Sequence, residues 1–315
     1  MSAPGLLVCG YKRPDNLAKI LNSPALEYFP SILISLDVVE NLDERKLLAK
    51  VYRDLILGST YSNKISVSSG QTHAGLYYGM RRAIDLAFER FETCVILEED
   101  CIPGLHLPKF INELLDKHKY LILESHVCLS RHVKRDGFSG LLTQTKYPFV
   151  WGWLTSREVW AKSRIEANTL NRDDVMTALR KVPGSHESFQ NHWLRMFDAC
   201  SLVATARNSG QLNGLDQSDR FTSWALNSWA TPYTLAYWTQ NESRPAIRPH
   251  SNFIRNVGFD NRASHTFRRP RHARRIDLFR VDTSSALPNS IEEYDRLEDL
   301  EIFGIESSSK LKENK

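Results

Sequence analysis

The first hundred residues alternate between short apolar runs and segments with helical periodicity, and this alternation limits the folds open to the chain. Four apolar runs bounded by turn residues are predicted to be strands: GLLVCGY (5–11), SILISLD (31–37), NKISVSS (63–69) and TCVILEED (93–100). Three segments with apolar residues at steps of three and four are predicted to be helices: NLAKILNS (16–23), ENLDERKLLAKVYRDLIL (40–57) and THAGLYYGMRRAIDLAFERF (72–91). Strands that alternate with helices are joined by right-handed crossovers, so we predict an α/β fold with a mostly parallel sheet flanked by helices.

Polar residues stand just beyond three of the predicted strands. The segment 10–14 carries Lys12 and Arg13, Asp37 ends the second strand, and the acids at 98–100 end the fourth. Ligands of a parallel sheet bind beyond the carboxyl ends of its strands, so these residues should line one crevice.

The three consecutive acids indicate a ligand rather than a solvated turn. Glu98, Glu99 and Asp100 repel one another unless a positive group lies among them, and oxygen ligands are those that Mg²⁺ and Mn²⁺ prefer. The chain has no G-x-x-x-x-G-K-[ST] loop and no G-x-G-x-x-G after the first strand, which argues against a P-loop NTPase and a dinucleotide-dependent oxidoreductase. A metal held on short acidic residues then points to a sugar nucleotide.

Composition and cysteine usage indicate a cytoplasmic globular protein. The 315 residues are 42% hydrophobic and 25% charged, and no apolar run approaches the roughly 18 residues of a membrane span. The N-terminus lacks the pattern of a secretory signal. The five cysteines are scattered, which argues against a disulfide framework or a zinc cluster and fits a reducing compartment.

The crevice residues resemble those of a known family. The segments YKRPDNLAKIL (11–21), SGQTHAGLYYGM (69–80) and VILEEDCIP (95–103) together are similar to GT-A glycosyltransferases. More closely, they resemble bacterial nucleotide-diphospho-sugar transferases related to N-acetylglucosaminyltransferase I, which carry an E-D-D version of the D-x-D motif. Glu99 here replaces the middle aspartate, and the last acid is retained as Asp100.

Three later segments extend the resemblance. KYPFVWGWLTSREVWAK (146–162) is similar to the family's W-G-W-A-T-W segment, and FTSWALNSWATPYTLAYW (221–238) stands where the family has a tryptophan-rich helix. PHSNFIRNVGFDNRASHTF (249–267) resembles its P-x-x-N-L-V-x-N-I-G-F...A-T-H-T segment. We therefore expect a single GT-A-like glycosyltransferase domain at 1–267 and a basic, then acidic, extension at 268–315.

The resemblance implies a donor site with a divalent metal, Mn²⁺ or Mg²⁺. Asp100 is expected to bind the metal that bridges the phosphates of a UDP- or GDP-sugar. His265 is expected to be a second metal ligand, and a structural histidine bonded to the backbone is equally open. The residues expected to contact the donor are Tyr11, Arg13, Asp37, Glu98 and Glu99. For Arg13 an exposed basic turn, and for Asp37 an ordinary strand-ending turn, are the alternatives.

A catalytic base is required if the reaction inverts the anomeric carbon, as the resemblance implies. A carboxylate would take the proton of the acceptor hydroxyl. In some relatives that acid follows the tryptophan of the late helix, where this chain has Ala225. Asp219 is therefore the predicted base, and Asp216 and Glu187 are the alternatives.

Trp151, Gly152 and Trp153 are predicted to contribute to an acceptor or sugar pocket. Aromatic faces stack on sugar rings, and glycine allows a substrate to approach the backbone. The alternative is that both tryptophans belong to the hydrophobic core.

The segment FRRPRHARR (267–275) concentrates positive charge after the last family motif. Its arginines are Arg268, Arg269, Arg271, Arg274 and Arg275. A solvated face, contact with the donor diphosphate, and peripheral docking on an anionic membrane surface that carries a lipid-linked acceptor are three open interpretations.

The sequence thus predicts a metal-dependent glycosyltransferase. It would move a hexosyl or N-acetylhexosaminyl group from the donor to a hydroxyl of a glycan or lipid-linked acceptor, in bacterial cell-surface polysaccharide assembly. The alternative is a basic protein that binds nucleic acid or a membrane surface without transferase activity, but it leaves the strand-end acids unexplained, and we expect no nucleic-acid partner. A sugar-nucleotide pyrophosphorylase would need a glycine-rich basic signature that LLVCGYKRPDN (6–16) lacks.

Overall fold

The first half of the chain forms four parallel strands with helices between them. The computed structural model describes residues 2–130, 142–182, 184–242, 244–249 and 252–258. Short 3-10 turns aside, the chain begins with β1 (Gly5–Gly10), α1 (Pro14–Leu21), β2 (Ile32–Leu36), α2 (Leu42–Leu57), β3 (Ile65–Ser69), α3 (Gly75–Arg90) and β4 (Thr93–Glu98). The strands lie in the order β3-β2-β1-β4, and each neighbouring pair is parallel. The α/β fold predicted from the alternating pattern is confirmed.

Short strands from the second half widen this sheet. They are β6 (Val127–Cys128), β7 (Leu142–Thr145), β8 (Trp153–Ser156) and β9 (Ala246–Pro249). The full order of the eight-stranded sheet is β3-β2-β1-β4-β8-β6-β9-β7, with β8 and β7 antiparallel to their neighbours. The sheet is therefore mostly parallel, as predicted, with an antiparallel component that the sequence did not indicate.

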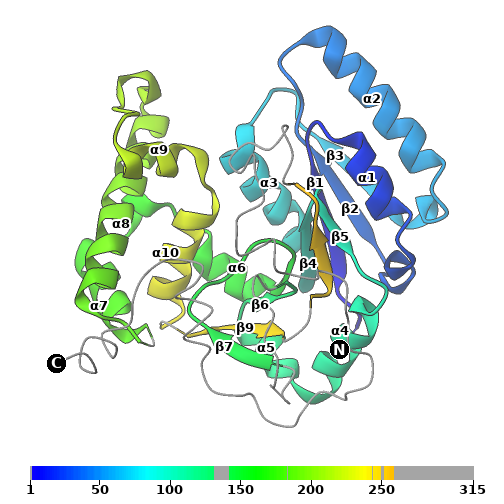
Figure 1. The fold of residues 1–315 in the computed structure, drawn as a ribbon. Helices are drawn as coiled ribbons and strands as arrows, with labels where there is room; N and C mark the ends of the chain where they lie inside the picture. The colour runs from blue at the N-terminus through cyan, green and yellow to red at the C-terminus, as the bar shows by residue number, and fades with distance from the viewer. Residues whose placement is uncertain (1, 131–141, 183, 243, 250–251, 259–315) are drawn as a thin grey trace.

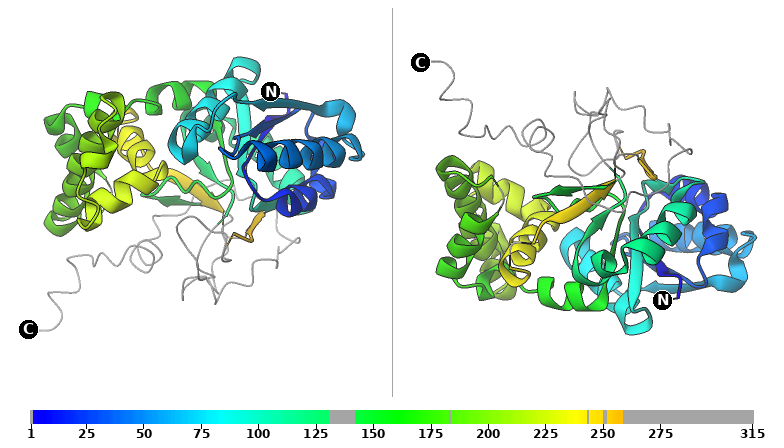
Figure 2. Two further views of the ribbon diagram at one scale, coloured as in Figure 1. Left: turned by 90° about the horizontal axis from the view of Figure 1, so that it is seen from above. Right: turned by 90° about the horizontal axis from the view of Figure 1, so that it is seen from below.

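Helices cover both faces of the sheet because its central strands are apolar on both sides. Leu6 and Val8 of β1 pack with α1, α2, α4 (Leu107–Lys117) and α5 (Lys119–Glu124), whereas Leu7 faces α3. Five more helices extend the α3 side: α6 (Arg157–Ser163), α7 (Arg172–Lys181), α8 (Glu187–Asn208), α9 (Arg220–Asn227) and α10 (Ala230–Gln240). Figures 1 and 2 show α7–α10 grouped at the opposite end of the molecule from α1 and α2. No helix in the described ranges is long and apolar enough to cross a bilayer.

The crossover through α3 creates a switch point in the sheet. The connections from β1 to β2 and from β2 to β3 move outward, whereas α3 returns the chain to β4 on the other side of β1. The carboxyl ends of β1 and β4 therefore lie side by side while their loops leave in opposite directions. Such switch points are where open α/β sheets bind ligands.

The segment expected to be one tryptophan-rich helix forms two. Helix α9 ends at Asn227, and Ser228 has extended backbone angles (φ −116°, ψ 128°). The hydroxyl of Ser228 accepts a hydrogen bond from the backbone N–H of Thr231 at 3.1 Å, which supplies a partner for an N–H in the first turn of the new helix. Pro232, which lacks an N–H, is compatible with the first turn of α10 but not with the interior of one continuous helix.

His126 is a fully buried histidine in the aromatic core between the sheet and α10. Its ring stacks on Trp153 at 4.5 Å between centroids. Its Nδ1 lies 3.0 Å from the hydroxyl of Tyr233, and its Nε2 lies 2.6 Å from the carbonyl oxygen of Phe149. Burial lowers the pKa of His126 to about 3.

We expect His126 to weaken the folded state in acid. Its unfolded pKa is about 6.5, so between about pH 6.5 and pH 3 the unfolded chain binds a proton that the folded chain excludes, and stability falls as the pH falls. Relative to His126→Gln, the wild type should lose about 2 kcal/mol of unfolding free energy between pH 7.5 and pH 5. Urea unfolding of both proteins at the two pH values measures this difference, in which the contributions of all other groups cancel. The same pH dependence in both proteins would contradict it.

Candidate functional site

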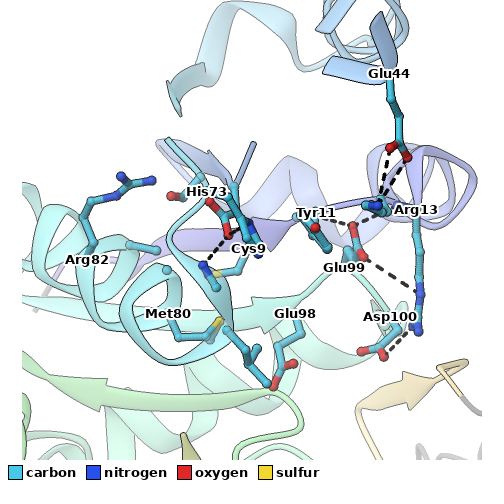
Figure 3. A pocket seen from close by; sticks show the side chains of 18 residues that line it. Cys9, Tyr11, Arg13, Glu44, His73, Met80, Arg82, Glu98, Glu99 and Asp100 are labelled. Atoms are coloured by element: carbon cyan, nitrogen blue, oxygen red, sulfur yellow. Dashed lines mark hydrogen bonds and ion pairs between the residues drawn. The ribbon is translucent and has the colours of Figure 1, made fainter. Parts of the chain in front are cut away.

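A cavity of about 620 Å³ opens at the switch point of the sheet. Its walls come from the loop after β1, the end of β2, the first turns of α3 and the acids after β4. The lining includes six of the predicted site residues: Tyr11, Arg13, Asp37, Glu98, Glu99 and Asp100. The prediction that these strand-end residues share one crevice is confirmed. Figure 3 shows the side chains of Tyr11, Arg13 and the three acids around it.

Glu99 holds the loop that follows β1. Its Oε2 accepts hydrogen bonds from the backbone N–H groups of Tyr11 at 2.7 Å and Arg13 at 3.3 Å. These bonds join the end of β4 to the start of α1, and so fix the position of the basic loop relative to the acids. Burial raises the pKa of Glu99, and the two N–H donors oppose that rise.

Asp100 forms an ion pair with Arg13 at the edge of the cavity. The Arg13 Nη1 lies 3.1 Å from Asp100 Oδ2, and the Arg13 side chain is only 9% exposed. The exposed-turn alternative for Arg13 is therefore wrong. Burial raises the pKa of Asp100, and the Arg13 charge opposes the rise. The pair brings a fixed cation and a carboxylate to the same point of the cavity wall.

Glu98 lies deeper, against the start of α10. Its carboxylate accepts a hydrogen bond from the side chain of Trp229, the residue that precedes α10. Burial, and then the charge of Asp100, raise the pKa of Glu98 well above its usual range. A carboxylate that is crowded by a second carboxylate in a buried site is a place where an added cation is strongly stabilised.

Asp37 positions the start of α3. Its Oδ1 accepts from the N–H of Ala74 at 2.9 Å, its Oδ2 accepts from Gly75 at 3.0 Å, and the same Oδ2 lies 2.9 Å from Nδ1 of His73. These contacts supply partners for N–H groups that a helix leaves unpaired at its N-terminus. His73 stacks on the ring of Tyr11 at 5.1 Å between centroids. Asp37 is thus more than a strand-ending turn residue, because it ties this aromatic pair to α3.

Positive side chains stand on both sides of the cavity. Lys12 and Arg13 line the cavity from the loop after β1, and Arg82 lines it from α3. Figure 3 shows Arg13 and Arg82 on opposite sides. Lys12 lies 3.4 Å from Glu44 of α2, and both side chains are 43% exposed. The cavity therefore mixes fixed cations with carboxylates, an arrangement that suits an anionic ligand bound together with a metal ion.

The late segment of the chain returns to Asp100. Strand β10 (Ile254–Asn256) pairs with β5 (Cys101–Pro103), and the N–H of Val257 donates to the carbonyl of Asp100 at 2.8 Å. A Cβ on Gly258 would lie 1.9 Å from Asp100 Oδ2, so only glycine fits beside this carboxylate. The segment that leads to His265 therefore passes next to Asp100. His265 itself lies outside the described residues.

The three residues predicted to line a sugar or acceptor pocket belong to the interior. Trp153 is fully buried on β8 and stacks on His126, so the core interpretation holds for it. Gly152 has φ +73°, and a Cβ there would lie 2.6 Å from Ile254, so the glycine is required by backbone conformation and packing. Trp151 is half-buried and packs against the core clusters. None of the three lines the cavity at the switch point.

The predicted catalytic acids serve as turn and cap residues. Asp219 precedes α9, and its carboxylate accepts from the N–H of Thr222 at 2.7 Å. Asp216 accepts from the N–H and the hydroxyl of Ser218 at 2.9 and 2.6 Å. These hydrogen bonds lower the pKa of both acids, which makes each a weaker base, and neither lines the cavity. The geometry gives no support to a catalytic role for either.

We expect Asp219→Ala to affect the stability of the protein more than its chemistry. Removal of a helix N-cap leaves the N–H of Thr222 without its partner, so the thermal midpoint should fall slightly. Any catalytic turnover of the wild type should be retained, and Asp219→Asn, which keeps a capping oxygen, should restore the midpoint. If turnover collapses in both variants while the midpoint stays unchanged, Asp219 is the base after all.

The acids of the cavity fit a hard divalent cation that is bound together with a phosphate. Asp100 and Glu98 would hold it, since both offer only oxygen donors in one buried site. Burial raises the pKa of both carboxyl groups, and the charge of Asp100 adds to the rise at Glu98. Among the described residues, no group of three or more histidine, cysteine or acidic side chains is arranged as a complete metal site. Mg²⁺ commonly needs only one or two protein carboxylates and takes its other ligands from substrate phosphates and water.

Three partners in the site were not predicted from the sequence: His73, Trp229 and Gly258. All three fall within the segments that carry the family resemblance, 69–80, 221–238 and 249–267, so their position was a usable signal. The pairing of Trp229 with Glu98 in particular depends on how α10 packs on the sheet.

Comparisons with known proteins assign no family to the chain. No protein-family model and no curated protein matches it. Over 51% of its length it is similar to residues 1–349 of TarS from S. aureus (TM-score 0.31, 15% identity), of which it covers 49%. It also covers 74% of a putative glucose-1-phosphate thymidylyltransferase from Bacillus anthracis (TM-score 0.29, 10% identity) and 81% of an apo UDP-glucose pyrophosphorylase (TM-score 0.28, 10% identity). The chain thus spans about half of the TarS structure. At TM-scores this low, these likenesses define neither a family nor an activity.

Proposed function

We propose that the chain is a metal-dependent glycosyltransferase that takes its sugar from a UDP- or GDP-sugar. The observation that carries the proposal is the Arg13–Asp100 ion pair, which lies beside Glu98 and Glu99 at the switch point of the sheet. The cavity of about 620 Å³ is within the usual range for a small-molecule site.

The two ends of the cavity suit the two ends of a nucleotide diphosphate. The stacked pair of Tyr11 and His73, tied to α3 by Asp37, offers an aromatic edge for the base and ribose. Arg13 offers a guanidinium for the diphosphate, and guanidinium groups bind phosphate oxygens in pairs. Binding across the cavity would therefore place the phosphates at Asp100.

The protein groups at the reacting end have distinct tasks. Asp100, with Glu98 beside it, would hold Mn²⁺ or Mg²⁺, which when bound supplies positive charge for the departing nucleoside diphosphate. Arg13 would add charge to the same phosphate oxygens. Glu99 keeps the backbone of Tyr11 and Arg13 in place, so its task is to position them rather than to contact the sugar.

The remaining parts of the proposal follow the resemblance stated above. They are inversion at the anomeric carbon, a hexosyl or N-acetylhexosaminyl group as cargo, a glycan or lipid-linked acceptor, and a place in bacterial cell-surface polysaccharide assembly. The arginines of 268–275, for which membrane contact is proposed, lie outside the described residues.

A thermal-shift panel tests the proposed donor class. The protein is heated with each of a set of UDP- and GDP-sugars, with and without Mn²⁺ or Mg²⁺. One donor should raise the thermal midpoint only when metal is present. No shift with any donor, together with salt-sensitive binding of a polynucleotide, would favour the nucleic-acid alternative.

A further inference from the structure

Trp224 is an exposed tryptophan whose ring is held in a fixed position. It is 57% exposed, whereas the other six tryptophans of the chain are buried or half-buried. Its Nε1 donates to the hydroxyl of Thr231 at 2.8 Å, and Thr231 is itself held by Ser228. An indole that contributes little to the core, yet is bonded in one orientation, provides a rigid apolar face to a ligand.

Positive charge surrounds the same face of α9. Phe221 lies one turn before Trp224, and residues three apart are neighbours on a helix. The guanidinium of Arg195, from α8, lies 4.1 Å from the Phe221 ring centre, and that of Arg220 lies 5.5 Å away. Both arginines are exposed, and the nearby acid, Asp219, is bonded to the backbone of α9. We call Trp224, Phe221, Arg220 and Arg195 the α9 surface.

The α9 surface adjoins the elements that form the cavity. The residues that fix Trp224 belong to the junction between α9 and α10, and Trp229 of this junction donates to Glu98 in the cavity. On the other side, Arg207 of α8 donates to the carbonyl of Leu226 at 2.8 Å and lies over the ring of Tyr77 of α3 at 4.4 Å. Figure 1 shows the end of α9 and the start of α10 on the side of the helical group that faces α3.

We infer that the α9 surface binds a saccharide acceptor that carries acidic groups, carboxylate or phosphate. The inference rests on the proposed function, because it names the substrate that would meet the donor at Glu98 and Asp100. Stacking on Trp224 suits a sugar ring, and Arg220 and Arg195 offer the forked donors that bind carboxylates and phosphates in pairs.

A saccharide fits this surface better than a nucleic acid strand. Single strands bind along grooves that combine continuous positive charge with several stacking aromatics. Here, in the part of the chain that the structure describes, the exposed aromatic face is a single tryptophan, and the basic side chains beside it are the two arginines near Phe221. This is too short a surface for a continuing strand. A short acidic saccharide can place its charges on the arginines and leave a hydroxyl toward the cavity.

The test uses the full chain on an array of oligosaccharide pairs that differ only in acidic groups, carboxylate, sulfate or phosphate against hydroxyl. The wild type should retain acidic members over their neutral partners, and calorimetry on the best pair should give the affinities. Trp224→Ala should weaken binding by about tenfold, Trp224→Phe should restore most of it, and Arg220→Gln with Arg195→Gln should remove the preference for the acidic member.

Two matched controls remove the same kinds of side chain elsewhere. Tyr120→Ala deletes an aromatic that is 51% exposed on α5, and Lys46→Gln deletes an exposed charge on α2, so both should bind as the wild type does. Thermal midpoints of all variants establish that they are folded.

Three results would overturn the inference: no acidic member retained above its neutral partner, equal retention by Trp224→Ala, or tighter binding of a dT12 oligonucleotide through the same residues. The thermal-shift panel, run on the same proteins, separates this failure from that of the proposed function. If donors bind and no acidic saccharide is retained, only the inference is lost. If no donor binds, the glycosyltransferase proposal itself is lost.

Discussion

Replacing Asp100 by asparagine is expected to reduce sugar transfer by about a thousandfold and leave the chain folded. The amide has nearly the same shape, but it carries no charge to pair with Arg13, whose Nη1 lies 3.1 Å from Oδ2, and it is a poor ligand for a hard cation. Release of the nucleoside diphosphate measures turnover, and circular dichroism establishes the fold.

Two further variants separate the loss of the Asp100 carboxylate from the general effect of removing an acidic side chain. Asp116→Asn removes an exposed acid from α4 and should leave turnover unchanged. Gly258→Ala keeps the Asp100 carboxylate but places a Cβ 1.9 Å from Oδ2, so it must displace the carboxylate and should also lower turnover. If Asp100→Asn retains wild-type turnover with the same metal dependence, the assigned metal site is wrong.

Replacing Trp153 by alanine is expected to cost about 3–5 kcal/mol of unfolding free energy, the range for a large aromatic side chain lost from a packed core. Trp153 is fully buried and touches His126, Trp160, Trp229 and Tyr233. Urea unfolding of the two proteins measures the loss.

The matched control for Trp153 is Trp224→Ala, which removes the same side chain from the surface and should cost far less. Any Trp153→Ala protein that is folded should still bind the donor, because Trp153 does not line the cavity. A variant with wild-type stability and no saccharide binding would instead support the pocket role that the sequence suggested.

The position of the site could be predicted because its signals are local. Strands β1, β2 and β4 are apolar runs followed by polar residues, and a parallel sheet brings such ends to one edge. Asp37 and Asp100 could therefore be assigned to one crevice from the sequence. Their partners could not, because the bond from Gly75 to Asp37 and the ion pair from Arg13 to Asp100 depend on how α3 and the β1 loop pack.

The second half was harder to predict because its strands are short and its aromatics are ambiguous. Strand β6 has two residues and β9 has four, too few for a periodic pattern. A tryptophan next to glycine, such as Trp153, is found both in sugar pockets and in tightly packed cores. The sequence does not show that Trp153 is buried and Trp224 exposed, and the structure does. The position of Asp219 shortly before Trp224 in the sequence predicts a catalytic base, whereas in the structure its carboxylate caps α9.

Binding of Mn²⁺, followed by electron paramagnetic resonance, shows directly whether Asp100 holds a metal together with a nucleoside diphosphate. The protein is titrated into Mn²⁺ alone, Mn²⁺ with UDP and Mn²⁺ with GDP, and each series is compared with the same solution without protein. We expect one nucleoside diphosphate to increase strongly the fraction of Mn²⁺ bound to the wild type, and Asp100→Asn to abolish this increase. Two results would contradict this assignment of the metal site. In one, the wild type leaves the Mn²⁺ signal unchanged with both nucleotides. In the other, Asp100→Asn changes the signal as much as the wild type does.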